Sequence, residues 1–330
     1  MNLEYRIFNI QEAEFEQLAL ETFRFQHAHN NVYRMFSDAL HIDPIKVTTV
    51  ASIPFLPVTF FKSHDVTSGL FEPEVVFESS GTTDTGNSRH LVRSSSLYSK
   101  SFLTGFQLFY GDVAGWCVIG LLPSYLERRN SSLVLMVDEL IRRSEHPNSG
   151  FYLYEHDKLA SIIKSNEAAG QKTMLIGVTF ALLDFAQVFS FPLKHTVVME
   201  TGGMKGRRKE VTREEVHAEL MQAWKIGQVH SEYGMTELLS QAYSKGGGKF
   251  YTPPWMKVLA RGEDDPLHVV LPGDKVENGL ANIIDLANIH SCSFIAVDDI
   301  CSLHPDGGFE ILGRMDSSDV RGCSLMVRGT

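Results

Sequence analysis

The chain has 330 residues, of which 43% are hydrophobic and 21% charged, and its formal net charge is −10. Such a composition is typical of a globular protein with one large domain or two ordinary ones. The acidic balance argues against general binding to nucleic acid or anionic membranes, because both need basic surfaces, but it leaves room for a small local anion site.

The sequence also predicts a cytoplasmic protein without a membrane span. The first residues, MNLEYRIFNIQEAEFEQ, carry acids and lack the apolar core of a signal peptide. The longest apolar-rich stretch, 174–191, is interrupted by polar residues and by Gly177, whereas a membrane span needs about 20 apolar residues in a row. Four cysteines without a C-x-x-C pair predict neither a disulfide framework nor a zinc site.

The first three quarters of the chain predict helices and strands in alternation. Apolar spacing and turn residues predict a helical region over 11–40, an extended segment over 53–58 containing two prolines, a strand over 75–77, a helix over 97–110, a strand over 115–122, a helix over 133–143 begun by Ser131 or Ser132, strands over 173–178 and 196–199 with a helical stretch between them, and a helix from Thr212 to Trp224. Glu215 follows Thr212 at the spacing of a capping box. This alternation predicts an α/β fold with a mainly parallel sheet covered by helices.

The pattern changes near residue 245, where Gly246-Gly247-Gly248 interrupts the chain. Beyond it, short strand-like runs follow without a convincing long helix, at 257–260, 268–271, 281–285, 294–297 and 309–312. We therefore predict an α/β core over 1–245, a smaller β-rich subdomain over 246–316 and a C-terminal tail over 317–330.

A hydroxyl- and glycine-rich segment follows the predicted strand 75–77. It reads Ser79-Ser80-Gly81-Thr82-Thr83. Hydroxyls donate hydrogen bonds to anionic oxygens, and glycine lets backbone N–H groups approach a phosphate closely. No Gly-Lys-Ser/Thr follows, so the segment is not a Walker loop. A polar surface turn is the alternative interpretation.

Two further segments carry residue types suited to a nucleotide. Tyr233-Gly234-Met235-Thr236-Glu237 combines an aromatic ring, a glycine, a hydroxyl and a carboxylate that could ligate Mg²⁺. The second segment contains Asp298-Asp299 and then Gly313-Arg314-Met315-Asp316. Pro305-Asp306-Gly307-Gly308 between them predicts a hairpin turn, which accounts for those four residues but not for the flanking charges.

In this order, the three segments resemble the adenylate-forming superfamily of acyl- and aryl-CoA ligases, luciferases and adenylation domains. Ser79–Thr83 looks like its phosphate loop, and Tyr233–Glu237 matches its Tyr-Gly-x-Thr-Glu motif. Asp299 lies where that family has its ribose-binding aspartate, and Arg314 matches the arginine of its Gly-Arg-x-Asp motif. The resemblance implies the main-domain fold of this superfamily.

The resemblance also implies ATP and Mg²⁺ as cofactors and a role for each residue. Tyr233 would stack on adenine, and Gly234 would allow the ligand to approach. Thr236 would contact the α-phosphate or the acyl carboxylate, and Glu237 would hold Mg²⁺. Asp299 would accept hydrogen bonds from the ribose, with Arg314 nearby. The phosphate-binding residues would be Ser79, Ser80, Gly81, Thr82 and Thr83.

One branch is more similar still: the acyl-protein synthetases of bacterial bioluminescence (LuxE-type, long-chain fatty acid–luciferin-component ligases). The segment 53–62, the glycine-rich segment 201–206 and Arg321-Gly322-Cys323-Ser324-Leu325 carry this resemblance, together with the short chain. It implies that the acid, most simply a fatty acid, is activated as an acyl-adenylate and passed to Cys323, and then to a partner such as a reductase or carrier.

The chain departs from the superfamily pattern in two places. Asp84-Thr85-Gly86 follows the phosphate loop where the family has Gly-x-Pro-Lys-Gly, and Arg89 is the nearest cation. Only 14 residues follow Asp316, whereas the full ligases continue into a mobile C-terminal domain with a catalytic lysine. We therefore expect that domain to be absent and the charge of the reaction to be stabilised from elsewhere.

Two other functions remain open at this point. The chain could be a CoA ligase of the phenylacetate type, with CoA as acceptor in place of Cys323. It could also be a nucleotide-binding subunit that needs a partner to act. The identity of the acid, the final acceptor and the oligomeric state do not follow from these motifs.

Overall fold

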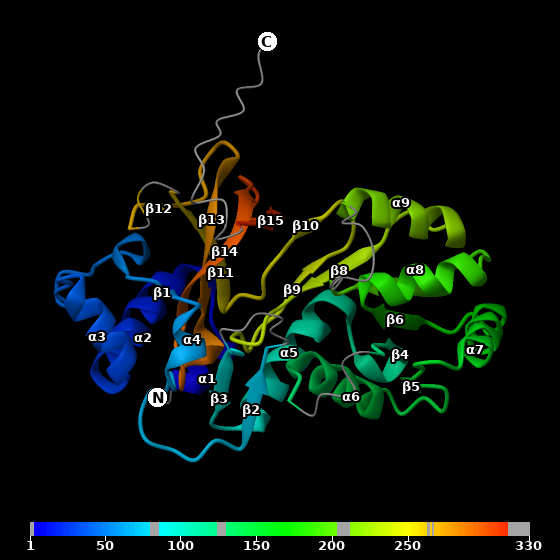
Figure 1. Ribbon diagram of the computed structural model, residues 1–330, viewed down its shortest axis with the longest axis horizontal. Helices are drawn as coiled ribbons and strands as arrows, with labels where there is room; N and C mark the ends of the chain where they lie inside the picture. The colour runs from blue at the N-terminus through cyan, green and yellow to red at the C-terminus, as the bar shows by residue number, and fades with distance from the viewer. Residues whose placement is uncertain are drawn as a thin grey trace, which may run out of the picture.

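The computed structural model describes residues 3–79, 86–123, 130–202, 212–262, 265 and 267–315 (Figure 1). Within these residues, a six-stranded and a seven-stranded sheet lie towards opposite ends of the molecule, and a two-stranded hairpin lies apart from both. The mixed α/β architecture that the sequence predicts is confirmed.

The six-stranded sheet is parallel except for its last strand. Its strand order is β5-β4-β6-β7-β8-β9, and β9 runs antiparallel to β8. Every residue of β4 and β6 is buried, so these strands read as continuous apolar runs in the sequence. The bounds are β4 Cys117–Leu121, β5 Gly150–Phe151, β6 Thr173–Gly177, β7 Thr196–Glu200, β8 His230–Tyr233 and β9 Ala242–Ser244.

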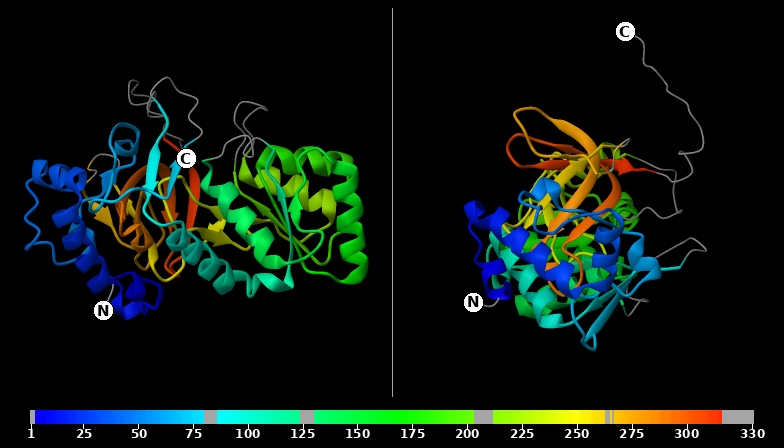
Figure 2. Two further views of the ribbon diagram at one scale, coloured as in Figure 1. Left: turned by 90° about the horizontal axis from the view of Figure 1, so that it is seen from below. Right: turned by 90° about the vertical axis from the view of Figure 1, so that its left-hand side faces the viewer.

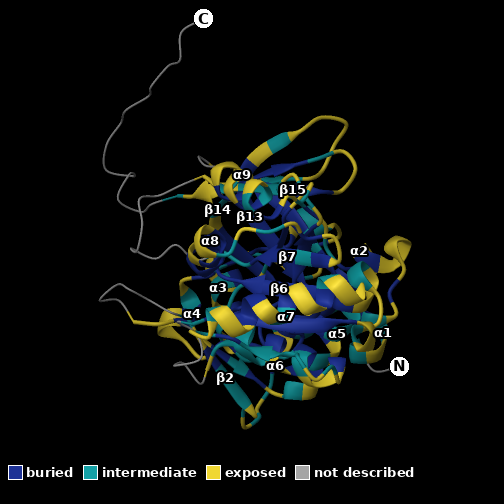
Figure 3. Ribbon diagram, turned by 90° about the vertical axis from the view of Figure 1, so that its right-hand side faces the viewer, coloured by how far each residue is buried: buried dark blue, intermediate teal, exposed yellow. Residues whose placement is uncertain are grey.

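Helices cover both faces of this sheet, as predicted. Helices α8 and α9 pack together on one face, and α5 and α6 pack together on the other (Figure 1). Figure 3 shows α7 with an exposed outer surface over the buried strand β6. The bounds are α5 Ser95–Tyr110, α6 Ser132–Ser144, α7 His156–Ala169, α8 Thr179–Val188 and α9 Arg213–Trp224.

Two predicted helix starts are confirmed by their hydrogen bonds. The Ser131 hydroxyl accepts a bond from the Val134 N–H at 3.4 Å, so Ser131 rather than Ser132 caps α6. At the start of α9, the Thr212 hydroxyl accepts from the Glu215 N–H, and the Glu215 carboxylate accepts from the Thr212 N–H, which completes the capping box.

The seven-stranded sheet contains the β-rich sequence after residue 245. Its strand order is β10-β15-β14-β13-β11-β12, all antiparallel, and β1 pairs with β14 in parallel. Among the described residues after 245, the only helical element is the 3₁₀ turn Leu286–Asn288. The bounds are β1 Leu56–Pro57, β10 Lys249–Phe250, β11 Met256–Arg261, β12 Val269–Val270, β13 Glu277–Asp285, β14 Phe294–Leu303 and β15 Phe309–Arg314.

The N-terminal helices pack against this C-terminal sheet, as Figure 2 shows for the blue helices and orange strands. The predicted helical region 11–40 divides at Asn30, whose side chain caps α3 and donates to the Ser291 carbonyl. Gln26 of α2 donates to the carbonyl oxygens of Asn288 and Ile289. The bounds are α1 Leu3–Phe8, α2 Phe15–His29, α3 Asn31–Ala39 and α4 Phe60–Ser63, with 3₁₀ turns at Glu12–Glu14, Val50–Ser52 and Val113–Gly115.

Two extended segments before residue 245 do not join the parallel sheet. The proline-containing segment supplies β1 to the other sheet, and β2 (Val75–Glu78) pairs only with β3 (Arg89–Val92) as an antiparallel hairpin. The hydroxyl-rich segment therefore lies between two antiparallel strands. The division of the chain at residue 245 stays a prediction. No helix in the described part of the chain is long and apolar enough to cross a membrane.

Candidate functional site

Residues from two of the three motifs meet where the two large sheets approach each other. Tyr233 is the last residue of β8, and its hydroxyl donates to Asp299 Oδ2 at 2.7 Å. Asp299 and Arg314 lie directly opposite each other on β14 and β15, and Arg314 Nε is 3.5 Å from Asp299 Oδ1. Burial, together with the Asp299 carboxylate, raises the pKa of Tyr233 well above its usual value, so its hydroxyl remains a donor.

The Tyr233 ring packs against two aromatic residues of the β-rich sheet. Phe250 and Phe309 contact it edge-to-face, with centroid distances of 5.9 and 5.7 Å. The stacking of Tyr233 on adenine stays a prediction.

The turn after Tyr233 is tied to three separate elements. His90 Nδ1 of β3 lies 2.9 Å from the Thr236 carbonyl oxygen, and Asn288 donates to the Glu237 carbonyl at 2.8 Å. Asp285, the last residue of β13, accepts from the N–H groups of Leu239 and Ser240, each at 2.9 Å. Burial lowers the pKa of His90 to about 4, so the ring is neutral, and its proton must be on Nδ1 because a carbonyl only accepts. These contacts fix the backbone that carries Thr236 and Glu237.

Glu237 is buried close to two cations. Burial raises the pKa of its carboxyl, and a hydrogen bond from Ser88 and the charges of Arg314 and Lys62 oppose that rise. No group of three or more metal-ligating side chains exists in the described ranges. A Mg²⁺ ion at Glu237 would therefore take most of its oxygens from phosphate and water, which is how proteins often bind this ion beside a nucleotide.

The first residue of the hydroxyl-rich segment, Ser79, is hydrogen-bonded to Ser88, which also bonds Glu237. The Ser79 N–H donates to the Ser88 carbonyl at 3.0 Å, and the Ser79 hydroxyl accepts from the Ser88 N–H at 2.9 Å. Ser80, Gly81, Thr82 and Thr83 lie outside the described residues, so their role stays a prediction. Arg89, the nearest cation in sequence, forms an ion pair with Asp65 at 3.2 Å.

Gly234 lies directly against a neighbouring carboxyl group. A Cβ at this position would lie 2.4 Å from Glu232 Oε1, so any side chain would displace Glu232. Burial, and then the charge of Glu200, raise the pKa of Glu232 to about 8. Glu200 keeps its charge because Thr179, Gly202 and His217 surround its carboxylate with donors, and its pKa is lowered. At neutral pH, Glu200 is therefore ionised and Glu232 is protonated and neutral.

Cys323, the predicted acyl carrier, lies outside the described residues. Cys117, Cys292 and Cys301 are free and buried. Burial raises the pKa of all three thiols, to about 12 for Cys292 and Cys301. A protonated, buried thiol is a poor nucleophile, so none of these three is suited to carry an acyl group.

Sequence reasoning missed the residues that position the turn. His90, Asp285 and Asn288 are far from the motif in sequence, and only the paired sheets bring them to it. Asp285 follows an apolar run, which indicates a strand end but not its partner. Lys62 lies in the segment 53–62, and its sequence neighbours give no sign that its charge acts on Glu237.

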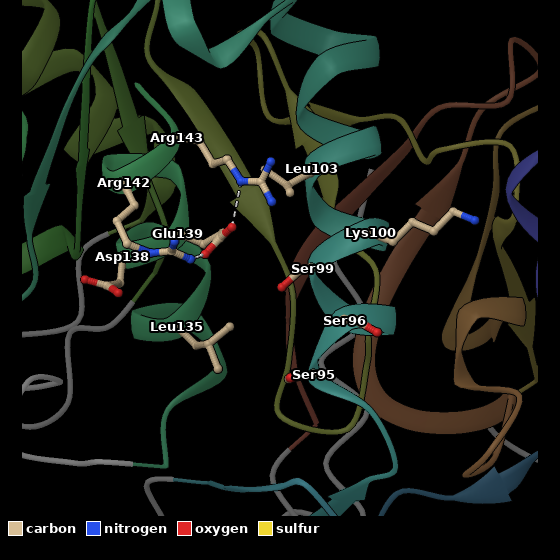
Figure 4. A pocket seen from close by; sticks show the side chains of 10 residues that line it. All are labelled: Ser95, Ser96, Ser99, Lys100, Leu103, Leu135, Asp138, Glu139, Arg142 and Arg143. Atoms are coloured by element: carbon tan, nitrogen blue, oxygen red, sulfur yellow. Dashed lines mark hydrogen bonds and ion pairs between the residues drawn. The ribbon is translucent and has the colours of Figure 1, made fainter. Parts of the chain in front are cut away.

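A separate groove of about 510 Å³ lies between α5 and α6 (Figure 4). Glu139 forms ion pairs there with both Arg142 and Arg143. None of the predicted site residues lines this groove. Its lining residues are Ser95, Ser96, Ser99, Lys100, Leu103, Leu135, Asp138, Glu139, Arg142 and Arg143.

No protein-family model and no curated protein matches the chain. Similar solved structures include the luciferase-like enzyme of the mealworm Zophobas morio (14% identity, TM-score 0.48, 76% of this chain and 60% of that chain). Another is o-succinylbenzoate coenzyme A synthetase of Bacillus subtilis in complex with ATP and magnesium ion (14%, 0.48, 77% and 51%). A third is a long-chain-fatty-acid–CoA ligase of Archaeoglobus fulgidus (12%, 0.46, 73% and 51%).

This chain spans between half and three fifths of the length of those three proteins. Similarity at this level concerns the arrangement of helices and strands, and it does not identify a reaction.

Replacing Tyr233 with Phe should lower the free energy of unfolding by about 1–2 kcal/mol, because Asp299 loses a donor in a largely buried position. Urea denaturation measures the change. Tyr251→Phe is the matched control, since the Tyr251 hydroxyl also donates to a carboxylate, Asp306, but at the surface. Its cost should stay below about 0.5 kcal/mol, and equal losses in the two variants would contradict a bridging role for Tyr233.

Glu232 should make a contribution to the free energy of unfolding that falls as the pH rises from 6 to 8, and Glu232→Gln should remove this contribution to the slope. With a folded-state pKa of about 8, Glu232 keeps a proton that the unfolded chain has already released, so folding is disfavoured as the pH rises. Urea denaturation at pH 6, 7 and 8 measures the slope, and the exposed Glu72→Gln variant should parallel the wild type. Parallel slopes for wild type and Glu232→Gln would show that Glu232 is ionised throughout.

Proposed function

We propose that the protein activates a carboxylic acid with ATP, forming an acyl-adenylate and pyrophosphate. The observation that carries this proposal is the meeting of Tyr233, Asp299 and Arg314 in one hydrogen-bonded group, with Glu237 nearby. These residues come from motifs about 60 to 80 positions apart, and the resemblance assigns all of them to one nucleotide. A chance surface turn would not bring them together.

In the proposed reaction, a carboxylate oxygen of the acid attacks the α-phosphorus of ATP. The bond from the α-phosphorus to the bridging oxygen breaks, and pyrophosphate leaves with that oxygen and its electron pair. No proton is transferred, so the protein's contribution is positioning and charge neutralisation. A Mg²⁺ ion held by Glu237 would neutralise phosphate charge.

The other residues would position the reactants. Thr236 would contact the α-phosphate or the acid, and Asp299 would accept from the ribose, with Arg314 beside it. Tyr233 and Gly234 would border the adenine. The phosphates would lie against the segment Ser79–Thr83, whose first residue bonds Ser88, a hydrogen-bond partner of Glu237.

For the second half of the reaction, we propose acyl transfer to Cys323 and then to a partner protein such as a reductase or carrier. The C-terminal sequence around Cys323 supports this choice, and the buried, protonated state of the other three thiols leaves them unsuited to it. A fatty acid is the substrate class that the resemblance favours.

The first half of the reaction predicts acid-dependent exchange of labelled pyrophosphate into ATP. Glu237→Gln should lower this exchange by about 100-fold, because a charged metal ligand is lost, whereas the exposed Glu72→Gln should leave it unchanged. Exchange is measured with fatty and aryl acids, alongside the nucleotide-induced shift in thermal midpoint. The proposal is wrong if no acid supports exchange and no nucleotide shifts the midpoint. A nucleotide shift without exchange would favour a nucleotide-binding subunit instead.

The second half predicts a covalent label on the protein. Labelled acid with ATP should leave a label on the protein that hydroxylamine removes, because hydroxylamine cleaves thioesters. Cys323→Ser should abolish this label, because the thiol that accepts the acyl group is lost. Cys301→Ser is the control and should retain the label. If added CoA instead accelerates AMP release and Cys323→Ser is fully active, the acceptor is CoA and the transfer to Cys323 is excluded.

A further inference from the structure

The cations near Glu237, and Arg89 beyond the hydroxyl-rich segment in sequence, differ in whether a carboxylate already pairs with them. Arg314 forms an ion pair with Asp299, and Arg89 forms one with Asp65. Lys62, whose charge acts on Glu237, has no carboxylate within ion-pair distance among the residues that the structure describes. Its side chain is exposed. Lys62 is therefore the cation near Glu237 that is available to an anionic ligand.

The short helix that carries Lys62 is itself held in place. Helix α4 packs on β3 (Figure 1), and Phe61 is fully buried, with its ring edge-on to His90 at a centroid distance of 5.8 Å. His90 in turn bonds the Thr236 carbonyl at 2.9 Å. A continuous series of contacts thus links Lys62 to the backbone of the turn that carries Glu237.

Strand β3, on which α4 packs, begins directly after Ser88. Ser88 bonds both Ser79 and Glu237. Ser79, the first residue of the hydroxyl-rich segment, therefore lies next to the strand on which α4 packs. The charges of Lys62 and Arg314 both act on Glu237, so an anion bound beside Glu237 would be attracted by both cations.

We propose that Lys62 binds the phosphate groups of the nucleotide and neutralises the charge that develops on the departing pyrophosphate. This inference rests on the proposed function. Lys62 acts as a point charge and neither gives nor takes a proton, so the atoms of the reaction balance without it. It supplies the cation that is missing after the hydroxyl-rich segment, where Asp84-Thr85-Gly86 contains no lysine.

Isothermal titration calorimetry with MgATP and with adenosine tests the proposal. Lys62→Met should weaken MgATP binding by about ten-fold or more and change adenosine binding by less than about two-fold, because only the phosphates lose a partner. Lys62→Arg should recover most of the MgATP affinity. Lys46→Met is the matched control, since Lys46 is 84% exposed on a turn remote in sequence from the motifs, and it should bind both ligands like the wild type.

Two results would overturn the role of Lys62 and leave the proposed function standing. One is unchanged MgATP binding in Lys62→Met. The other is equal weakening of MgATP and adenosine binding, which would indicate a structural role for α4. Absence of MgATP binding in the wild type would overturn the proposed function and this inference with it. Pyrophosphate exchange provides a second readout, in which Lys62→Met should lose rate and Lys46→Met should not.

Discussion

The carboxylate of Asp285 joins the two halves of the molecule. It accepts hydrogen bonds from the N–H groups of Leu239, Ser240 and Ala287 and from the Ser240 hydroxyl, in a position with no exposure to solvent. Ser240 also accepts from the indole N–H of Trp255, so the turn after the parallel sheet is attached to the β-rich sheet at several points. Burial raises the pKa of Asp285 to about 6, and its four donors oppose that rise.

This anchor has a consequence for the site. Buried donors left without an acceptor each cost about 1–3 kcal/mol, so the turn cannot move away from Asp285 without losing several bonds together. Thr236 and Glu237 lie three or four residues before Ser240 on the same turn, and His90 and Asn288 hold its other side. The two catalytic candidates are therefore rigid with respect to Asp299 and Arg314, which lie on the second sheet. Such preorganisation is what a reaction driven by positioning requires.

The charge states of the buried carboxyl groups around the site depend on how many hydrogen-bond donors surround each of them. Glu200 has three donors and stays ionised, whereas Glu232 is buried close to that charge and holds a proton at neutral pH. Tyr98 and Tyr110 on α5 and Tyr243 on β9 lie near Glu232. Burial raises the pKa values of these tyrosines, and the charge that Glu232 acquires at high pH raises them further.

The sequence by itself determined the local structure and the residue types of the site. Proline pairs, capping residues and apolar periods act through neighbouring atoms, so the helix start at Thr212, the extended segment at 53–58 and the β-rich character after residue 245 could be predicted. The motif at 233–237 and the pair Asp299 and Arg314 could be named because their spacing is short. Only the tertiary structure decided which residues support them: β1 joins the second sheet, Asp285 and Asn288 hold the turn by hydrogen bonds, and Lys62 lies where its charge acts on Glu237. These contacts connect segments that are about 50 to 240 residues apart, and local sequence carries no record of which distant strand or helix will pack beside it.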